Sequence, residues 1–271
     1  SNDVGISGVV DFSNQNVDAL LALLQSGGVD TLDFRAILAE RQAVAEQSWH
    51  SAFFRTDHHW LPETGLWAAE VLARHLNDAW GFTLDAAKLT PERFHIEWYP
   101  DWFLGSQGKK ATLAVASPED FMLPYPKDQA DLTLTIPSLS LERRGGFEVL
   151  YQYELLGSQD YYADSPYTAY FYGDAALKML HNHNGDSGVK LLVLQDSFAN
   201  ALTPFLALTV DEADALDLPE KTFEKRPVPL SAGEMRAYRQ MQQESLVWLG
   251  AHEATAGNVL TRMLRLQQIT G

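Results

Sequence analysis

The feature that most constrains the fold is an almost wholly apolar run, residues 189–194, followed at once by Gln195, Asp196 and Ser197. An apolar run of this length is typical of a central parallel strand that is covered on both faces. A helix is expected directly after the turn, over residues 198–208. The sequence therefore predicts a strand–turn–helix unit with Ser197 at its turn.

Helix and strand patterns alternate towards both ends of the chain, which favours an α/β fold with a mostly parallel sheet. The expected helices cover residues 14–25, 35–47, 63–77 and 175–180, and the expected strands cover 29–34, 131–136, 147–153, 189–194 and 213–218. We expect one domain over residues 1–271. Within it, 89–172 reads as a β-rich insertion, and 220–271 reads as a helical tail of unassigned role with helices at 231–249 and 255–269.

Composition excludes several classes of protein. The formal charge is −16, which argues against a nucleic-acid partner, because phosphate binding depends on Lys and Arg. Cysteine is absent, so the chain has no disulfide and no thiolate nucleophile. No apolar stretch reaches the length of a membrane span. The first residues lack a basic-then-apolar leader pattern, and we expect that a leader has been removed.

A serine at a strand end can act as a nucleophile when a base and an orienting carboxylate lie nearby. Residues 57–60, Asp-His-His-Trp, offer both partners. His59 is the better base, because Asp57 lies two residues before it and can reach its Nδ1 through a turn. The alternatives remain open at this point: Ser197 caps a helix, and the two histidines form a loop that packs on Trp60.

A metal centre is the competing interpretation. Two histidines plus an aspartate, as in residues 57–59, can bind zinc, and elsewhere His181 and His183 form an H-x-H pair with Asp174 and Asp186 nearby. Turn chemistry alone explains the composition of residues 181–188, however, and we expect no catalytic metal in the chain. No glycine-rich phosphate loop is present, and we expect no cofactor.

Several segments together resemble the DHHW protein family of bacteria. They are residues 54–60, 103–109, 172–174, 192–201 and 211–218. The family is similar to the SGNH-hydrolase-like domains of the periplasmic alginate O-acetylation proteins. The resemblance implies a three-layer, flavodoxin-like sheet with a permuted order of catalytic residues. It also implies that Ser197 is the nucleophile, His59 the base and Asp57 its orienter.

The implied activity is O-acetyl transfer to, or O-deacetylation of, a cell-surface or exopolysaccharide glycan outside the cytoplasm, with polysaccharide-assembly proteins as possible partners. The oxyanion candidates are the backbone of Ser197, the backbone of Gly173, and Asn200. Trp98, Trp102 and Tyr162 are candidates for stacking on sugar rings, although a small aromatic core within the insertion explains them equally well.

The chain also departs from the SGNH pattern. Gln195 stands where that pattern has a glycine, and the usual oxyanion blocks cannot be placed. These departures motivate the alternative of an inactive glycan-binding or assembly protein with the same fold.

Overall fold

The computed structural model describes residues 12–217, together with Met235, Arg236 and Arg239. The chain divides into two compact units, Ser1–Pro219 and Glu220–Gly271. The helices predicted at 231–249 and 255–269 lie outside the described residues, apart from those three, which have helical backbone. None of the described helices is long and apolar enough to cross a membrane.

Three of the predicted helices are confirmed near the start of the chain. They are α1 (Ser13–Ser26), α2 (Phe34–Val44) and α3 (Pro62–Trp80). The strand predicted over residues 29–34 is wrong, because the Asp33 carboxylate accepts a hydrogen bond from the Arg35 amide and so caps α2. Helix α3 begins with Pro62 and ends at Trp80, and the next residue, Gly81, caps it with a φ of +70° that suits glycine.

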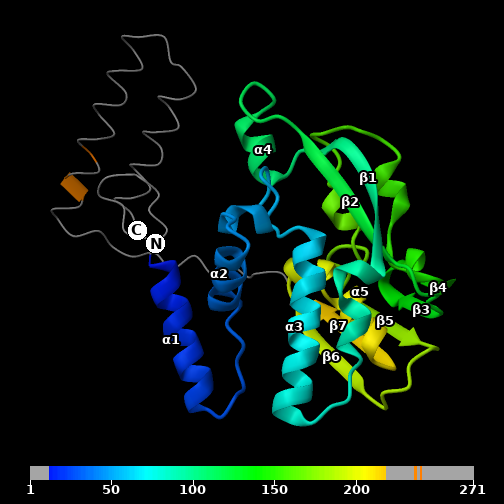
Figure 1. The fold of residues 1–271 in the computed structure, drawn as a ribbon. Helices are drawn as coiled ribbons and strands as arrows, with labels where there is room; N and C mark the ends of the chain where they lie inside the picture. Colours follow the sequence, from blue (N-terminus) through cyan, green and yellow to red (C-terminus); the bar gives the residue numbers. More distant parts are fainter. Residues whose placement is uncertain (1–11, 218–234, 237–238, 240–271) are drawn as a thin grey trace. The chain divides into compact units, whose positions relative to one another are not determined.

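The main sheet contains five strands in the order β4-β3-β5-β7-β6 (Figure 1). Their bounds are β3 (Leu132–Ile136), β4 (Leu141–Gly145), β5 (Leu177–Asn182), β6 (Lys190–Gln195) and β7 (Glu212–Asp217). Only β6 and β7 pair in parallel, and the other three pairings are antiparallel. The domain is therefore mixed α/β with a mixed sheet, and the prediction of a mostly parallel sheet holds only for β6 and β7.

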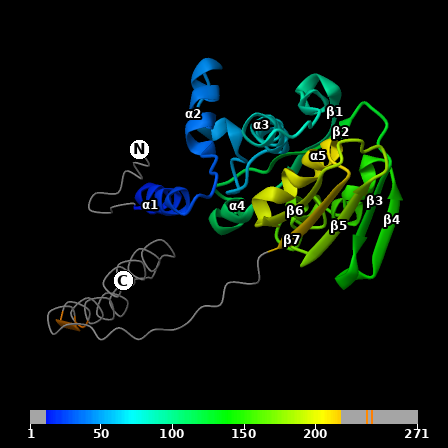
Figure 2. The same ribbon diagram turned by 90° about the horizontal axis from the view of Figure 1, so that it is seen from below.

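Strand β6 lies at the edge of the sheet, not at its centre as its apolar sequence predicted. Leu192 and Leu194 are 68% and 64% exposed, whereas Ala213 and Ala215 of β7 are fully buried. Helices α3 and α5 (Thr203–Leu206) lie on the same side of the sheet (Figure 2). Within the described residues the other face has no helical layer, so two layers are seen there where three were predicted.

The stretch 89–172 is not one separate insertion. Strands β1 (Phe94–Phe103) and β2 (Glu119–Pro126) form an antiparallel sheet of their own, with α4 (Ser106–Ala111) between them. Strands β3 and β4, in contrast, belong to the main sheet. The strand predicted at 147–153 is mainly the 3-10 helix η5 (Phe147–Leu150), and β5 replaces the helix predicted at 175–180. Short apolar runs fit either a helix or a strand, and here pairing with β3 and β7 decides for β5.

The helix predicted at 198–208 is broken into three short pieces. They are η8 (Ser197–Ala201), α5 and η9 (Ala207–Thr209). Pro204 lies in the first turn of α5 and has no amide hydrogen to continue a preceding helix. Helix α3 packs against η8, and Gly65 approaches so closely that an added Cβ would lie 1.9 Å from the Ala201 carbonyl oxygen. The glycine thus sets the distance between α3 and the segment that carries Ser197.

Candidate active site

The structure brings together the three residues that the sequence singled out. The Nε2 of His59 lies 2.8 Å from the Oγ of Ser197, although 138 residues separate them in the sequence. The Nδ1 of the same ring lies 2.5 Å from the Oδ1 of Asp57. We call these three residues the Asp–His–Ser array. Both ring nitrogens are engaged, so the array can pass a proton from the serine to the histidine.

The turn expected in the Asp57-x-His59 segment is present. The Oδ1 of Asp57 accepts the backbone amide of His59 at 3.0 Å as well as its ring nitrogen. The Oδ2 accepts the amide of Ser106 at 2.6 Å. Burial alone raises the pKa of the Asp57 carboxyl, but hydrogen bonds from the His59 ring and from these two amides outweigh it and hold the pKa well below its usual range. Asp57 is therefore ionised, as an orienting carboxylate must be.

Two hydrogen bonds tie the serine segment to neighbouring loops. The Trp60 indole donates to the Phe198 carbonyl at 2.9 Å, which links residues 57–60 directly to η8. The Tyr167 hydroxyl donates to the Ser197 carbonyl at 3.1 Å. The tryptophan of the Asp-His-His-Trp segment therefore has a structural task, which is to hold the serine opposite the histidine.

The His59 ring lies between two other rings. Tyr167 stacks on it with centroids 3.8 Å apart and planes 16° apart, and the His58 centroid lies 3.9 Å away with a 37° tilt. Two rings this close to one imidazole must occupy opposite faces of it. Tyr167 is only 4% exposed, so its ring packs against the His59 imidazole and is not available to a ligand in solution. Its position could not be read from the sequence, because nothing in residues 160–170 points to His59.

The predicted oxyanion donors differ in availability. The Gly173 amide already donates to the Tyr170 carbonyl at 3.1 Å. Asn200 is 1% exposed, and its side-chain nitrogen donates to Asp174. These contacts do not support Gly173 or Asn200 as oxyanion donors, because their polar hydrogens are engaged or buried. Within the described residues, the Ser197 amide has no hydrogen-bond partner, so it is the candidate that remains free.

Gln195 and Asn200 belong to a buried polar network under η8. The Gln195 amide donates to the Asn200 oxygen at 2.9 Å and accepts the Thr203 hydroxyl at 2.9 Å. The Lys178 ammonium is fully buried, donates to the same Asn200 oxygen at 2.7 Å, and lies 3.3 Å from Asp217. Burial lowers the pKa of Lys178, and the Asp217 carboxylate partly offsets this. The glutamine that departs from the SGNH pattern thus connects the end of β6 to η8 and α5, the segments that follow the serine turn.

The predicted sugar-stacking residues are not gathered at the array. Trp98 and Tyr162 are each 52% exposed, and the Tyr162 oxygen accepts the Leu113 amide at 3.1 Å. Trp102 is partly buried and packs edge-on against Tyr99. Within the described residues, none of the three predicted residues makes a hydrogen bond or ring contact with Ser197, His59 or Asp57. Their role in binding a sugar stays a prediction.

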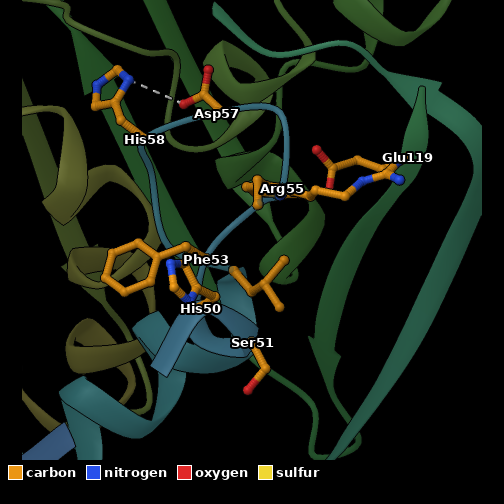
Figure 3. Close-up of a pocket in the computed structure, with 9 residues that line it drawn as sticks. His50, Ser51, Phe53, Arg55, Asp57, His58 and Glu119 are labelled. Atoms are coloured by element: carbon orange, nitrogen blue, oxygen red, sulfur yellow. Dashed lines mark hydrogen bonds and ion pairs between the residues drawn. The ribbon is translucent and has the colours of Figure 1, made fainter. Parts of the chain in front are cut away.

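A cavity of about 790 Å³ opens beside the array (Figure 3). Asp57 and His58 line one end, and Arg55 and Glu119 line its wall. Its lining is mainly apolar, with Phe53, Phe54 and Leu61 contributing. Among the described residues, neither Ser197 nor His59 lines the cavity, so it adjoins the reacting atoms without containing them.

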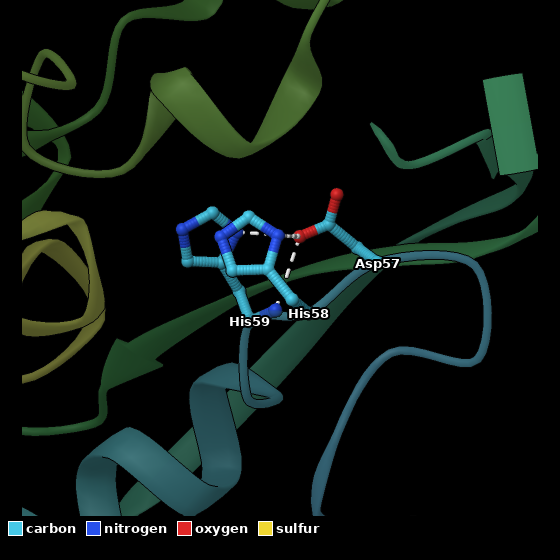
Figure 4. Close-up of side chains that lie close together, drawn as sticks. All are labelled: Asp57, His58 and His59. Carbon is cyan, nitrogen blue, oxygen red and sulfur yellow. Dashed lines mark hydrogen bonds and ion pairs between the residues drawn. The ribbon is translucent and has the colours of Figure 1, made fainter. Parts of the chain in front are cut away.

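One cluster of possible metal ligands occurs in the described part of the chain. It consists of Asp57, His58 and His59, whose candidate ligand atoms all lie within 4.8 Å of one another (Figure 4). The His181 and His183 rings lie 4.3 Å apart, but they do not form such a cluster with Asp174 or Asp186. From the sequence, two histidines and an aspartate were a conceivable zinc set, but no metal was expected and His58 had no catalytic role.

A serine, a histidine and an aspartate joined in this order, with the serine at a strand end, are the arrangement that serine acyl-transfer enzymes use. Residues 7–117 match the family described as the SGNH hydrolase-like domain of acetyltransferase AlgX. The match includes Asp57, His58 and His59 and ends before Ser197. The resemblance predicted from the Asp-His-His-Trp segment is therefore confirmed. Among curated proteins, no significant match was found.

Solved structures provide a second comparison. PatB1 of Bacillus cereus is 17% identical over 81% of this chain and 70% of its own, with a TM-score of 0.59. A PatB1 structure with a sulfonyl adduct is 18% identical over 69% of this chain and 59% of that one, with a TM-score of 0.50. PatB1 therefore supports the fold.

Two further structures have lower TM-scores. A DHHW family protein from Eubacterium siraeum is 19% identical over 70% of this chain and 56% of its own, with a TM-score of 0.47. The O-acetyltransferase domain of Pseudomonas putida AlgJ is 22% identical over 45% of this chain and 42% of its own, with a TM-score of 0.31. The chain thus spans less than two thirds of the DHHW protein.

Proposed function

We propose that this protein is an SGNH-like serine acyl-ester enzyme that transfers or removes O-acetyl groups on a carbohydrate. The observation that carries the proposal is the Asp–His–Ser array, with 2.8 Å between the Ser197 oxygen and His59 and 2.5 Å between His59 and Asp57. The AlgX family match supports acetyl chemistry. From the same resemblance we infer a glycan substrate and a location outside the cytoplasm, with polysaccharide-assembly proteins as possible partners.

The chemistry follows from the geometry. The Ser197 oxygen attacks the acetyl carbonyl while its proton passes to His59 Nε2, and Asp57 stabilises the imidazolium that forms. The tetrahedral intermediate collapses, the C–O bond to the donor breaks, and His59 returns the proton to the leaving oxygen. The acetyl-serine then reacts with an acceptor hydroxyl, whose proton His59 removes. A sugar hydroxyl as acceptor gives transfer, and water gives hydrolysis.

Oxyanion stabilisation decides between this function and its alternative. The free Ser197 amide provides one donor, whereas serine enzymes commonly use two or more. Because Gly173 and Asn200 are engaged elsewhere, an inactive glycan-binding protein with the same fold is the second candidate. The enzyme function requires a second donor to the oxyanion, and this donor has to come from the complex with bound substrate.

Hydrolysis of a chromogenic acetate ester separates the two functions. We expect Ser197→Ala to lower kcat/KM by about 10³-fold or more, because it removes the nucleophile. Ser26→Ala changes an exposed serine of α1 and serves as the matched control. Equal turnover by wild type and Ser197→Ala would reject the proposal that Ser197 is the nucleophile of an ester-cleaving enzyme.

A sulfonyl fluoride gives an independent readout of the nucleophile. PatB1 has been solved with a sulfonyl adduct, and we expect the same class of reagent to label Ser197 here. Peptide mass mapping should find the label on residue 197 in the wild type and none in Ser197→Ala. Labelling without turnover would point to a competent nucleophile whose natural acyl donor differs from the ester tested.

A further inference from the structure

One oxygen of Asp57 faces two imidazoles. Its Oδ1 lies 2.5 Å from the Nδ1 of His59 and 3.4 Å from the Nδ1 of His58 (Figure 4). The catalytic chemistry uses only the first of these contacts. His58 therefore places an additional nitrogen ligand beside the array without a part in proton transfer.

The spacing of these atoms is near that of a tetrahedral metal site. Zinc binds imidazole nitrogen and carboxylate oxygen at about 2.0–2.2 Å, which puts neighbouring ligand atoms about 3.4 Å apart. His58 Nδ1 already lies 3.4 Å from Asp57 Oδ1. The His59–Asp57 contact has to lengthen by about 1 Å on the same geometry. All three candidate ligand atoms lie within 4.8 Å of one another, so the residues already stand close to the spacing that an ion requires.

Access and charge also favour a cation at this point. The His58 side chain is 51% exposed, while Asp57 and His59 are 5% and 10% exposed, so the ion reaches the site from the His58 side. The Ser106 hydroxyl lies 3.3 Å from His58 Nδ1, and water can complete the coordination. The net charge of −16 raises the local concentration of cations.

We propose that Asp57, His58 and His59 form an inhibitory binding site for zinc or a similar divalent transition-metal ion. The proposed mechanism needs the His59 proton on Nδ1, against Asp57, with the Nε2 lone pair facing Ser197. A metal bound to Nδ1 uses the lone pair of that nitrogen, so the imidazole proton is then on Nε2. His59 then presents N–H to the serine and cannot accept its proton. Metal binding and catalysis therefore exclude each other.

The inhibitory consequence rests on the proposed function, but the binding does not. The test is a titration of zinc chloride into wild type, His58→Phe and His181→Phe, followed by calorimetry and by ester hydrolysis. Phenylalanine keeps a ring against His59 and removes the ligand nitrogen. His181→Phe is the matched control, since His181 is 48% exposed and belongs to the second histidine pair.

We expect one zinc ion per wild-type chain, loss of ester hydrolysis, and recovery with EDTA. In His58→Phe we expect affinity to fall at least about tenfold, with the remaining activity correspondingly resistant to zinc. His181→Phe should behave as wild type. Zinc binding that survives in His58→Phe but disappears in His181→Phe would overturn the proposal, as would an active wild type that neither binds zinc nor is inhibited. If no ester is hydrolysed at all, calorimetry still decides the binding.

Discussion

Thr56 shows at the scale of one residue how the array is held in place. Its amide and hydroxyl donate to Glu119 Oε1 at 2.6 and 2.5 Å, and its hydroxyl oxygen accepts the Gly105 amide at 2.9 Å. Its carbonyl accepts the amides of Gln107 and Gly108. Every polar group of this 4% exposed residue is thus bonded, directly beside Asp57. The Ser106 amide, at the start of α4, also donates to Asp57 itself, so Thr56 and the first turn of α4 together orient the carboxylate.

We expect Thr56→Val to lower kcat by about 10- to 100-fold with little change in KM, because Asp57 acts chiefly on the imidazolium of the transition state. Valine keeps the shape of threonine but leaves the Gly105 amide and the Glu119 carboxylate short of a partner, at a cost of about 1–3 kcal/mol. Steady-state kinetics on an acetate ester measure the effect.

A double-mutant cycle with Asp57→Asn distinguishes positioning from general destabilisation. If Thr56 acts through Asp57, Thr56→Val costs much less activity in the Asp57→Asn background, and Thr56→Ser restores most of the wild-type rate. Fully additive losses would show that the threonine has no particular connection to the carboxylate.

At the scale of elements, the contact between α3 and η8 fixes where the serine lies. Gly65 is buried in α3, and an added Cβ would lie 1.9 Å from the Ala201 oxygen and 2.8 Å from its carbonyl carbon. These are backbone atoms, which cannot rotate away as a side-chain end can. The first residues of α3 follow Trp60, and η8 begins with Ser197, so this contact joins the two halves of the array.

We expect Gly65→Ala to separate α3 from η8 and so to lengthen the His59–Ser197 contact. The free energy of unfolding should fall by about 1–3 kcal/mol through overpacking. A misplacement near 1 Å should lower kcat by up to about 100-fold. Asp78→Ala, on an exposed turn of the same helix, should change stability by no more than about 0.5 kcal/mol. A Gly65→Ala protein with wild-type stability and rate would contradict the close contact.

The elements also show where sequence patterns stop being informative. Helix α3 was predictable, because its apolar spacing is long and Pro62 marks its start. Strand β5 was not, because six residues fit either period and the buried Lys178 reads as a polar position. The burial of the Lys178 ammonium depends on Asn200, Asp217 and the Gly173 carbonyl, which come from other segments. A sheet position such as the edge location of β6 likewise depends on pairing partners that the strand itself does not encode.

Some features of the site were likewise predictable from local sequence, and others were not. Asp57 and His59 are two residues apart, so a local turn predicted their contact, and the strand end predicted the serine. Engagement of Gly173 and Asn200 in other hydrogen bonds depends on Tyr170 and Asp174, and no local pattern indicates it. Contacts that depend on partners distant in the sequence were therefore the ones that local patterns did not indicate.

At the scale of the whole molecule, charge bears on which of the proposed substrates should reach the site. The chain carries 36 acidic and 20 basic residues. Acidic groups also surround the array: burial chiefly, and then the negative charges of Asp57, Asp196 and Asp174, raise the pKa of Tyr167 well above its ordinary value. Lys110 is the positive group that acts on His58 from α4. A neutral acetylated sugar therefore meets less repulsion than a carboxylated one.

Ionic strength tests this preference, because salt screens repulsion over about 30 Å at 0.01 M and about 10 Å at 0.1 M. We expect kcat/KM for an acetylated oligosaccharide that carries carboxylates to rise by about 3- to 10-fold when salt increases over this range. An uncharged acetylated oligosaccharide of the same length is the control, and its kcat/KM should change little. Because the repulsion acts on encounter, the effect should appear in kcat/KM and leave kcat nearly constant. A carboxylated substrate that instead loses activity with salt would mean that basic residues such as Lys110 dominate the approach to Ser197, and an anionic glycan would then be the better substrate.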